Sequence, residues 1–532
     1  MKRLIIVLSV LVFLLGAFAL VTVSATEQTV YSGTCGAQGD NLVWTLDTTT
    51  GQLVISGEGE MADYAEWAQN KKFIKNVSIG NGVTSICGSA FYNCGNLISI
   101  SIPDSLTSIG MGAFKDCESM TGVYITDLAA WCNIVFRDNP LYYANNLYLN
   151  GDLVTDLVIP ESVTSISANA FKSCTNLTSV EIHDGVTSVG ENVFEYCENL
   201  KFTEYENAKY LGNKDNPYMC LYGLDNYLAE TALIHPDARL ICGRAFVSRE
   251  LVSIDIPDKI TSIGDSAFAG CSSLTSIDIP DSVISIGKEA FRSAGLTKVT
   301  IGSGVTSIGE YAFYGCSNLD ELHIKNLAAW CAINFESANA NPIGEAKNFY
   351  LNGEIIKDFV IPDDITSISK YAFANFNSLT SLTIGKGVKR IGKHAFINCE
   401  SLKIIEMPNS ITDVESDVFA GGRSIEKVIF YCGTQDEWEK YKFFINSDYK
   451  LEFHRYRAHV ENGVETYICT ECGAIQEEET ETTPLAQTEI AEYDEINSGC
   501  ASYLGSNVNV ILIALGSLAF VMRKNNKKKN QF

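Results

Sequence analysis

Residues 274–294 read LTSIDIPDSVISIGKEAFRSA, and this short stretch carries the pattern from which most of the chain is built. Leu274, Ile277 and Ile279 alternate with polar residues, as in a short strand with one buried face. Val283 and Ile286 mark a second strand. A phenylalanine follows in the turn after that strand. We expect these apolar side chains to point inward and the residues between them to face solvent.

The same pattern recurs through the middle of the chain with a period of 22 to 23 residues. Residues 97–117 read LISISIPDSLTSIGMGAFKDC, and residues 177–197 read LTSVEIHDGVTSVGENVFEYC. The marker phenylalanine lies at positions 91, 114, 171, 194, 246, 268, 291, 313, 373, 396 and 419. One such coil cannot bury its apolar side alone, whereas coils stacked about 4.8 Å apart share a core. The repeat therefore predicts a mainly β solenoid of stacked coils with short parallel strands.

The consensus sequence of the repeat, I-P-x-x-V-T-S-I-G-x-x-A-F-x-x-C-x-x-L, resembles the BspA-type leucine-rich repeat of bacterial and protozoan surface proteins. The resemblance covers residues 74–430. It implies a leucine-rich-repeat solenoid of about eleven coils that binds host matrix proteins or other cells. The coils marked by Phe246, Phe291 and Phe419 depart from the motif because they lack its cysteine, and the coil of Phe373 has Phe376 in that position.

Three longer segments interrupt the repeat, at 125–155, 201–235 and 324–358. The first and third share the sequences LAAWC and YLNG, whose Asn-Gly pair is typical of a tight hairpin turn. We expect each to form a hairpin that leads into the next coil. Trp131 and Trp330 would then either pack over the junction, which we favour, or serve as binding anchors. The middle segment is rich in Tyr, Asn and Asp, and we expect it to protrude.

The segments that flank the repeats suggest caps and a stalk. Residues 26–73 contain short alternating runs such as WTLD and LVIS, which predict a β-rich N-terminal cap. Residues 431–475 are expected to form a C-terminal cap. Residues 476–505 contain few large apolar side chains and many acids, so we expect an extended acidic stalk.

Both ends of the chain carry hydrophobic segments that predict its location. Residues 1–25 have a basic start, an apolar run and small residues at their end, as in a signal peptide. Residues 506–522 are mostly apolar and precede a basic tail at 523–532, as in a membrane segment with its positive end inside. We therefore expect an exported chain, anchored at the cell surface with its ectodomain outside. A sorting signal that is processed is the alternative for 506–522, although an LPxTG motif is absent.

Charge and motifs narrow the class of function. The formal net charge is -25, with 64 acidic and 39 basic residues, which argues against a nucleic-acid partner. The sequence contains no Ser-His-Asp order, HExxH helix, phosphate loop or dinucleotide fingerprint, so we expect no enzymatic activity.

Most of the 17 cysteines follow the repeat rather than a disulfide pattern. Seven lie three residues after a marker phenylalanine: Cys94, Cys117, Cys174, Cys197, Cys271, Cys316 and Cys399. Several have no partner at the same position of a neighbouring coil. We therefore favour a ladder of buried free thiols over a set of disulfides.

One group has the spacing of metal ligands. His454, His459, Cys469 and Cys472 could complete a tetrahedral zinc site. The alternative is that the two cysteines are oxidised and the histidines lie at the surface. No other cofactor is expected.

The outward positions of the first strand are the candidate interaction surface. They form a polar and partly acidic stripe, from which we select Tyr124, Glu181, Asp255, Asp278, His323 and Glu406. The partner would be an extracellular protein or a cell-surface ligand, which makes the chain a surface protein that mediates protein–protein interaction and adhesion. The alternative is a structural envelope or spacer protein with no specific ligand.

Overall fold

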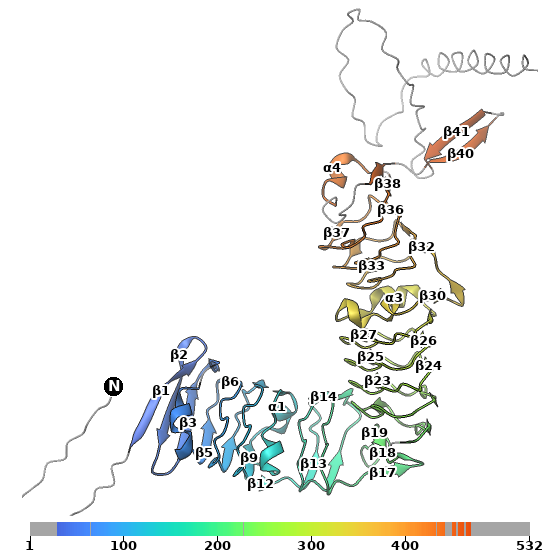
Figure 1. Cartoon of the computed structure of the whole chain (residues 1–532). Coiled ribbons are helices and arrows are strands. Elements are labelled where there is room, and N and C mark those ends of the chain that lie inside the picture. Colours follow the sequence, from blue (N-terminus) through green and yellow to red (C-terminus); the bar gives the residue numbers. More distant parts are fainter. Residues whose placement is uncertain are drawn as a thin grey trace, which may run out of the picture. The chain divides into compact units, whose positions relative to one another are not determined.

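The computed structural model describes residues 29–63, 65–226, 228–431, 433–441, 449–453, 456–461 and 464–469 (Figure 1). The predicted signal peptide, stalk, membrane segment and basic tail lie outside these residues. Contacts divide the chain into unit 1, Met1–Val154 with Ser173–Asn176, and unit 2, Thr155–Lys172 with Leu177–Phe532. In each unit, short parallel strands of successive coils pair side by side, which confirms the predicted leucine-rich-repeat solenoid.

Unit 1 contains two sheets, a long one from the first strand of each coil and a short one from the second. The long sheet has the order β1 (Val30–Gly36), β2 (Gly39–Asp47), β3 (Gln52–Gly57), β5 (Asn76–Ile79), β7 (Ser99–Ser101), β9 (Gly122–Ile125), β11 (Leu147–Leu149) and β12 (Asp152–Leu153). The short sheet has the order β10 (Val135–Phe136), β8 (Ser108–Ile109), β6 (Val83–Ile86) and β4 (Gly59–Glu60). The helices are η1 (Glu66–Phe73), α1 (Leu128–Cys132) and α2 (Leu141–Ala144). Strands β1 to β3 are antiparallel and form the predicted N-terminal cap, and β3 pairs in parallel with β5.

Unit 2 repeats this arrangement in several shorter sheets. The first strands form the pairs β13 (Asp156–Val158) with β15 (Ser179–Glu181) and β20 (Thr231–Ala232) with β22 (Ser253–Ile254). They then form the sheet β24 (Ser276–Asp278), β26 (Lys298–Ile301), β28 (Glu321–Ile324), β30 (Asn348–Leu351) and β31 (Glu354–Ile355). The last of these sheets is β32 (Asp358–Ile361), β34 (Ser381–Ile384), β36 (Ile404–Pro408), β38 (Lys427–Tyr431) and β39 (Lys450–Glu452).

The second strands of unit 2 form parallel ladders of their own. Two of them are β14 (Ser165–Ile166) with β16 (Ser188–Val189), and β33 (Ser367–Ile368), β35 (Arg390–Ile391) and β37 (Asp413–Val414). The longest begins with three antiparallel strands of the middle segment, β17 (Thr203–Tyr205), β18 (Ala208–Leu211) and β19 (Cys220–Leu224). It continues in parallel with β21 (Leu240–Ile241), β23 (Ser262–Ile263), β25 (Ser285–Ile286), β27 (Ser307–Ile308) and β29 (Asn334–Phe335). The helices are α3 (Leu327–Ala332), η2 (Ala338–Ala340), η3 (Pro342–Gly344) and α4 (Gln435–Trp438), and β40 (Tyr456–Glu461) pairs with β41 (Val464–Cys469).

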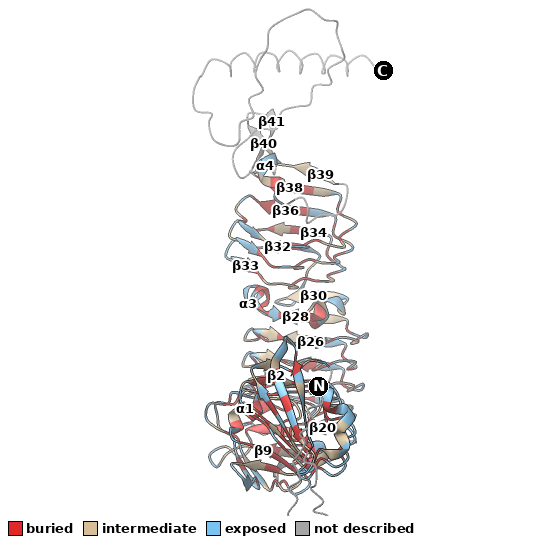
Figure 2. Ribbon diagram, turned by 90° about the vertical axis from the view of Figure 1, so that its left-hand side faces the viewer, coloured by how far each residue is buried: buried red, intermediate tan, exposed pale blue. Residues whose placement is uncertain are grey.

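The interior of each coil holds the apolar residues that the sequence pattern selects. Leu274, Ile277, Ile279, Val283 and Ile286 are all buried. Figure 2 shows the resulting change from buried to exposed residues along the strands of unit 2. The assignment of inward and outward positions is therefore confirmed for this coil.

The marker phenylalanines stack into columns behind the second strands. In unit 2, the ring centroids of Phe246, Phe268, Phe291 and Phe313 follow one another at 4.8, 5.1 and 5.1 Å. In unit 1, Phe91 and Phe114 stack at 5.3 Å, and Trp67 extends the column. These separations match the spacing of neighbouring strands, so one aromatic ring per coil fills the column.

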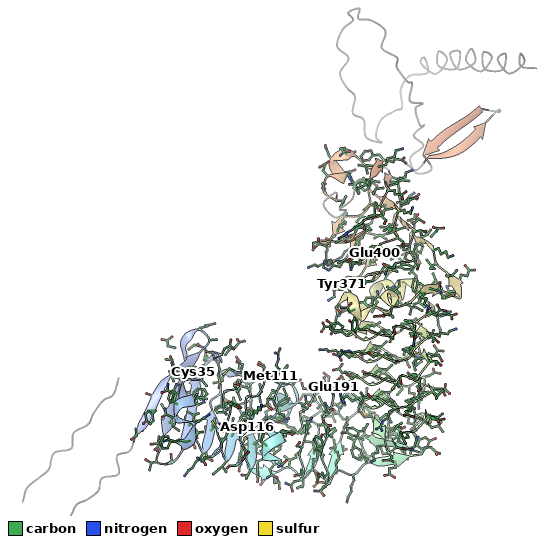
Figure 3. The ribbon with its side chains drawn as sticks, viewed as in Figure 1. Cys35, Met111, Asp116, Glu191, Tyr371 and Glu400 are labelled. Atoms are coloured by element: carbon green, nitrogen blue, oxygen red, sulfur yellow. A yellow bond between two sulfur atoms is a disulfide. The ribbon has the colours of Figure 1, made fainter. Side chains whose placement is uncertain are left out.

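The turn around each marker phenylalanine needs left-handed backbone on both sides of the ring. In the coil of Phe291, Glu289 has a φ of 56° and Ser293 also has a φ of 56°. Asp116 and Tyr371, both labelled in Figure 3, occupy the same two kinds of position in their own coils. This geometry turns the backbone so that the amide N–H of Phe291 donates to the carbonyl of Ala312 in the next coil at 2.7 Å.

The seven ladder cysteines are buried free thiols, as predicted. In five of them, Sγ donates to the carbonyl oxygen of the marker phenylalanine of the preceding coil, as Cys271 does to Phe246 at 2.9 Å and Cys316 to Phe291 at 3.1 Å. Burial raises the pKa of Cys94 to about 12 and that of Cys117 to about 11. The thiols therefore stay protonated and connect coils as weak donors.

The two segments that share LAAWC are complete coils rather than simple insertions. The helices α1 and α3 come first, and β10 and β29 then join the ladders of second strands. The predicted hairpins follow as β11–β12 and β30–β31, with Asn150 at a φ of 52° and Asn352 at 52° in their turns. Sequence analysis missed these coils because Ile134-Val135-Phe136 and its counterpart replace the V-x-x-I pattern.

The tryptophans of these two coils pack inside the fold. Trp131 and Trp330 are each 1% exposed, and Nε1 of Trp330 donates to the carbonyl of Ala372 at 2.9 Å. The packing role that we favour is therefore confirmed, and neither ring is accessible to a ligand.

The middle segment does not protrude as predicted. It folds into the antiparallel strands β17, β18 and β19, and β19 pairs with β21. Tyr210 and Leu221 are fully buried, so the segment contributes side chains to the core. A disulfide between Cys220 and Cys242 ties it to the next coil, a pairing that sequence analysis did not identify.

The core assignment gives a direct test with two substitutions. Replacing Phe291 by Ala should lower the free energy of unfolding by about 3 to 5 kcal/mol, because the ring is fully buried in its column. Replacing Thr306 by Ala should cost only about 1 kcal/mol, since its exposed hydroxyl donates a single hydrogen bond to the carbonyl of Ile284. Chemical denaturation measures both values, and equal losses would contradict the assignment.

The cysteine assignment predicts the outcome of alkylation. In native protein at pH 8, the seven ladder thiols should react slowly, because they are buried and neutral. After unfolding in denaturant without reductant, all seven should be alkylated, while Cys220 and Cys242 are recovered as a linked peptide. Mass spectrometry distinguishes these products, and recovery of linked ladder cysteines would contradict the thiol ladder.

Candidate functional site

The residues selected from the sequence lie on the outward face of the first strands or directly after them. Tyr124 belongs to β9 in unit 1. Glu181, Asp278, His323 and Glu406 belong to strands of unit 2, and Asp255 follows β22. Tyr124, Glu181, Asp255 and Asp278 are exposed, whereas His323 and Glu406 are half-buried.

Asp255 and Asp278 are the two selected residues that the structure brings to one site. They line a surface hollow of about 750 Å³ together with Asp258, Asp281 and Lys325. The backbone N–H of Ser303 donates to Oδ1 of Asp281 at 2.8 Å and lowers the pKa of that carboxyl below its usual value. Four carboxylates and one lysine give this hollow an excess of negative charge, which favours a basic surface on a partner.

Glu181 lies in a separate hollow of about 370 Å³, beside the middle segment. Its lining includes Lys201 and Lys214 as well as Asp156. Ser179 and Thr178 donate hydrogen bonds to Oδ1 of Asp156, and the Ser179 bond contributes most to lowering its pKa. This hollow combines charges of both signs and lacks the uniform acidity of the one at Asp278.

His323 is engaged within the protein. Its Nε2 lies 2.8 Å from Oε2 of Glu321, and its ring stacks on Tyr350 with centroids 4.4 Å apart. Nζ of Lys298 lies 3.3 Å from the same carboxylate. The hydrogen bond from His323 is the main cause that lowers the pKa of Glu321, and the bond from Lys298 is the second.

Tyr124 and Glu406 occupy other parts of the strand face. The ring of Tyr124 stacks on Tyr148 with centroids 4.6 Å apart. Glu406 accepts a hydrogen bond from Oγ1 of Thr383 at 3.4 Å. Tyr148 and Tyr350 were not selected from the sequence, although their place in the duplicated LYLNG and FYLNG stretches was a usable signal.

The side chains of the predicted zinc ligands lie outside the described residues. The backbone of His459 lies in β40 and that of Cys469 in β41, whereas His454 and Cys472 lie wholly outside them. Within the described part of the chain, no group of three or more His, Cys, Asp or Glu side chains could hold a metal ion. In the same part, no helix has the length and apolar character needed to cross a bilayer.

Comparison with models of protein families shows to which family this chain belongs. A family model described as "BspA type Leucine rich repeat region" matches six copies in residues 143–214, 240–341 and 345–462, more than half of the sequence. The chain belongs to the BspA-type leucine-rich repeat family. No curated protein matches it.

Several solved structures of leucine-rich repeat proteins are similar to this BspA-type chain. One from Eubacterium ventriosum is 23% identical, with 75% of this chain and 96% of that chain covered and a TM-score of 0.32. One from Bacteroides ovatus is 20% identical, with 77% and 98% covered and a TM-score of 0.32. A leucine-rich cell surface protein from Faecalibacterium prausnitzii is 20% identical, with 78% and 94% covered and a TM-score of 0.25.

Membership of the BspA-type family gives a general function. Leucine-rich repeat proteins act through protein–protein interaction and are generally non-enzymatic binding proteins. Proteins of the BspA type are typically exposed at the cell surface.

Proposed function

We propose that this chain is an exported adhesion protein, held at the cell surface, whose acidic strand face in unit 2 binds a basic region of another extracellular protein. The hollow at Asp255 and Asp278 carries the proposal, because it collects carboxylates on an outward, concave part of the first-strand face. Such a surface steers a partner of opposite charge and adds specificity to the contact.

Two further observations support the proposal. The family binds proteins in general, and the sequence predicts a signal peptide at 1–25 and an anchoring segment at 506–522. With an anchor at the C-terminal end, the repeats would lie outside the cell and be accessible to a partner. A spacer protein with no ligand is the competing function.

The test measures binding of residues 26–505 to immobilised fibronectin, fibrinogen, laminin and collagen by surface plasmon resonance at about 0.15 M salt. We expect at least one of these matrix proteins to bind, and Asp278→Lys to weaken that binding by at least about tenfold. The matched control is Glu400→Lys, which makes the same charge change at an exposed residue of a turn (Figure 3).

Each outcome separates the competing functions. Loss of binding with Asp278→Lys but not with Glu400→Lys supports the proposed surface. Equal loss with both variants would show that only the net charge matters. Absence of binding to all four proteins would favour the spacer function.

A further inference from the structure

Five successive strands of the long sheet in unit 1, from β3 to β11, carry no charged side chain on their outward face, and the neighbouring strand β2 carries the carboxylate of Asp47, which pairs with Gln52. Strands β3, β5, β7, β9 and β11 place nine residues in register on this face: Gln52, Val54, Asn76, Ser78, Ser99, Ser101, Gly122, Tyr124 and Tyr148. None of them is ionisable near neutral pH, in a chain with 64 acidic and 39 basic residues. A charge-free face of this size differs from the acidic face of unit 2.

Strand pairing arranges these residues in two straight rows. The first row runs Val54, Ser78, Ser101, Tyr124 and Tyr148, and the second runs Gln52, Asn76, Ser99 and Gly122. The residues between them, such as Val77, Ile100 and Val123, are buried in the core. The backbone therefore holds the polar groups on a fixed face, one position about every 4.8 Å.

Gly122 makes room for the pair of tyrosine rings at the end of this face. A Cβ atom at Gly122 would lie 3.0 Å from Cε2 of Tyr124 and 3.1 Å from Cε2 of Tyr148. Both rings consequently reach across the backbone of Gly122. They stack nearly parallel, with an interplanar angle of 9°, and Tyr124 is 37% exposed. Beyond Tyr124 the row continues with the small Ser101, which leaves space beside the ring.

The polar groups of this face offer neutral donors and acceptors. Oγ of Ser99 donates to Oδ1 of Asn76 at 2.8 Å, and Nε2 of Gln52 donates to Oγ of Ser78 at 3.1 Å. These bonds orient the amides but leave further hydrogen-bonding capacity at each group. None of the described residues forms a hydrogen bond with the side-chain hydroxyl of Tyr124, Tyr148 or Ser101.

The duplicated coil of unit 2 provides an internal contrast. There, Glu321 replaces Gly122 and His323 replaces Tyr124, while Tyr350 keeps the place of Tyr148. Lys298, Glu321 and His323 form ion pairs across that face. The second copy thus has a stacked ring pair but lacks the charge-free surroundings of the first.

We propose that the outward face of β3, β5, β7, β9 and β11 binds a neutral carbohydrate chain, with one sugar ring against the Tyr124–Tyr148 pair. The C–H face of a sugar ring matches the negative face of an aromatic ring. Its hydroxyls match the alternating amides and hydroxyls of the two rows. An anionic ligand would gain no ionic partner on these five strands. This activity goes beyond the proposed protein-binding function, which resides on unit 2.

The experiment uses residues 26–505 in native affinity gels that contain soluble neutral polysaccharides: glucomannan, xyloglucan, arabinoxylan, galactan and amylopectin. Polygalacturonate serves as an anionic comparison. We expect at least one neutral polysaccharide to slow migration, and titration with its hexasaccharide to show binding. Tyr124→Ala should weaken this binding by about tenfold or more. Tyr350→Ala is the matched control in the second copy and should leave the affinity unchanged.

A second variant tests the charge-free surroundings while it keeps an aromatic ring at position 124. Gly122→Glu combined with Tyr124→His reproduces the residues of the second copy and should abolish binding, while circular dichroism and the unfolding midpoint remain close to those of the parent. Three results would overturn the proposal: no retardation by any of the neutral polysaccharides, retardation that persists in Tyr124→Ala, or retardation by polygalacturonate alone. None of these results depends on whether the matrix proteins bind unit 2, so the two proposals fail separately.

Discussion

A single coil of this protein has no interior of its own, and every other property of the structure follows from the need to stack one coil on the next. Each coil places its marker phenylalanine and several aliphatic side chains in the shared core, and most coils add a cysteine three residues after the phenylalanine. The backbone N–H of Phe268 donates to Ala290, and that of Phe291 donates to Ala312, so the turns bond between coils as the strands do. These bonds and the burial that accompanies them depend on a period that brings equivalent residues into register.

Because stacking fills the interior of every coil, the residues available for binding lie on the outer surface. Because the inward positions are filled by Leu, Ile, Val and Phe, only the alternate strand positions are free to vary without loss of packing. Most of the threonines at the second strand donate a hydrogen bond from their hydroxyl to a carbonyl of the preceding coil, as Thr261 does to the carbonyl of Arg239 at 3.2 Å. The outward positions of the first strand are less constrained, and the two units use them differently. Unit 2 gathers carboxylates there, whereas strands β3 to β11 of unit 1 place no charged side chain on that face.

Particular residues show how far the sequence alone could lead. The alternation of Ile277 and Ile279 with polar residues predicts their burial, since a period of two places them on one face of a strand, and the recurrence of leucine at the position of Leu274 in most coils predicts the same for that residue. The cysteine position was identified as a packing site because alanine and phenylalanine also occur in it. By contrast, the disulfide between Cys220 and Cys242 depends on β19 joining β21, and no local pattern shows that pairing. The place of Tyr148 beside Tyr124 likewise depends on strand register and on the small Gly122.

Removing one complete coil tests most directly the claim that stacking in register holds the fold together. Deleting the 22 residues 274–295 joins two equivalent positions and should bring Phe268 against Phe313. We expect this variant to keep the circular dichroism spectrum of a β protein and to unfold cooperatively, with a modest loss of stability. Deleting the 11 residues 274–284 shifts all later coils by half a period and should abolish cooperative unfolding. If both deletions unfolded the protein equally, or if the half-period deletion were tolerated, the account would be contradicted.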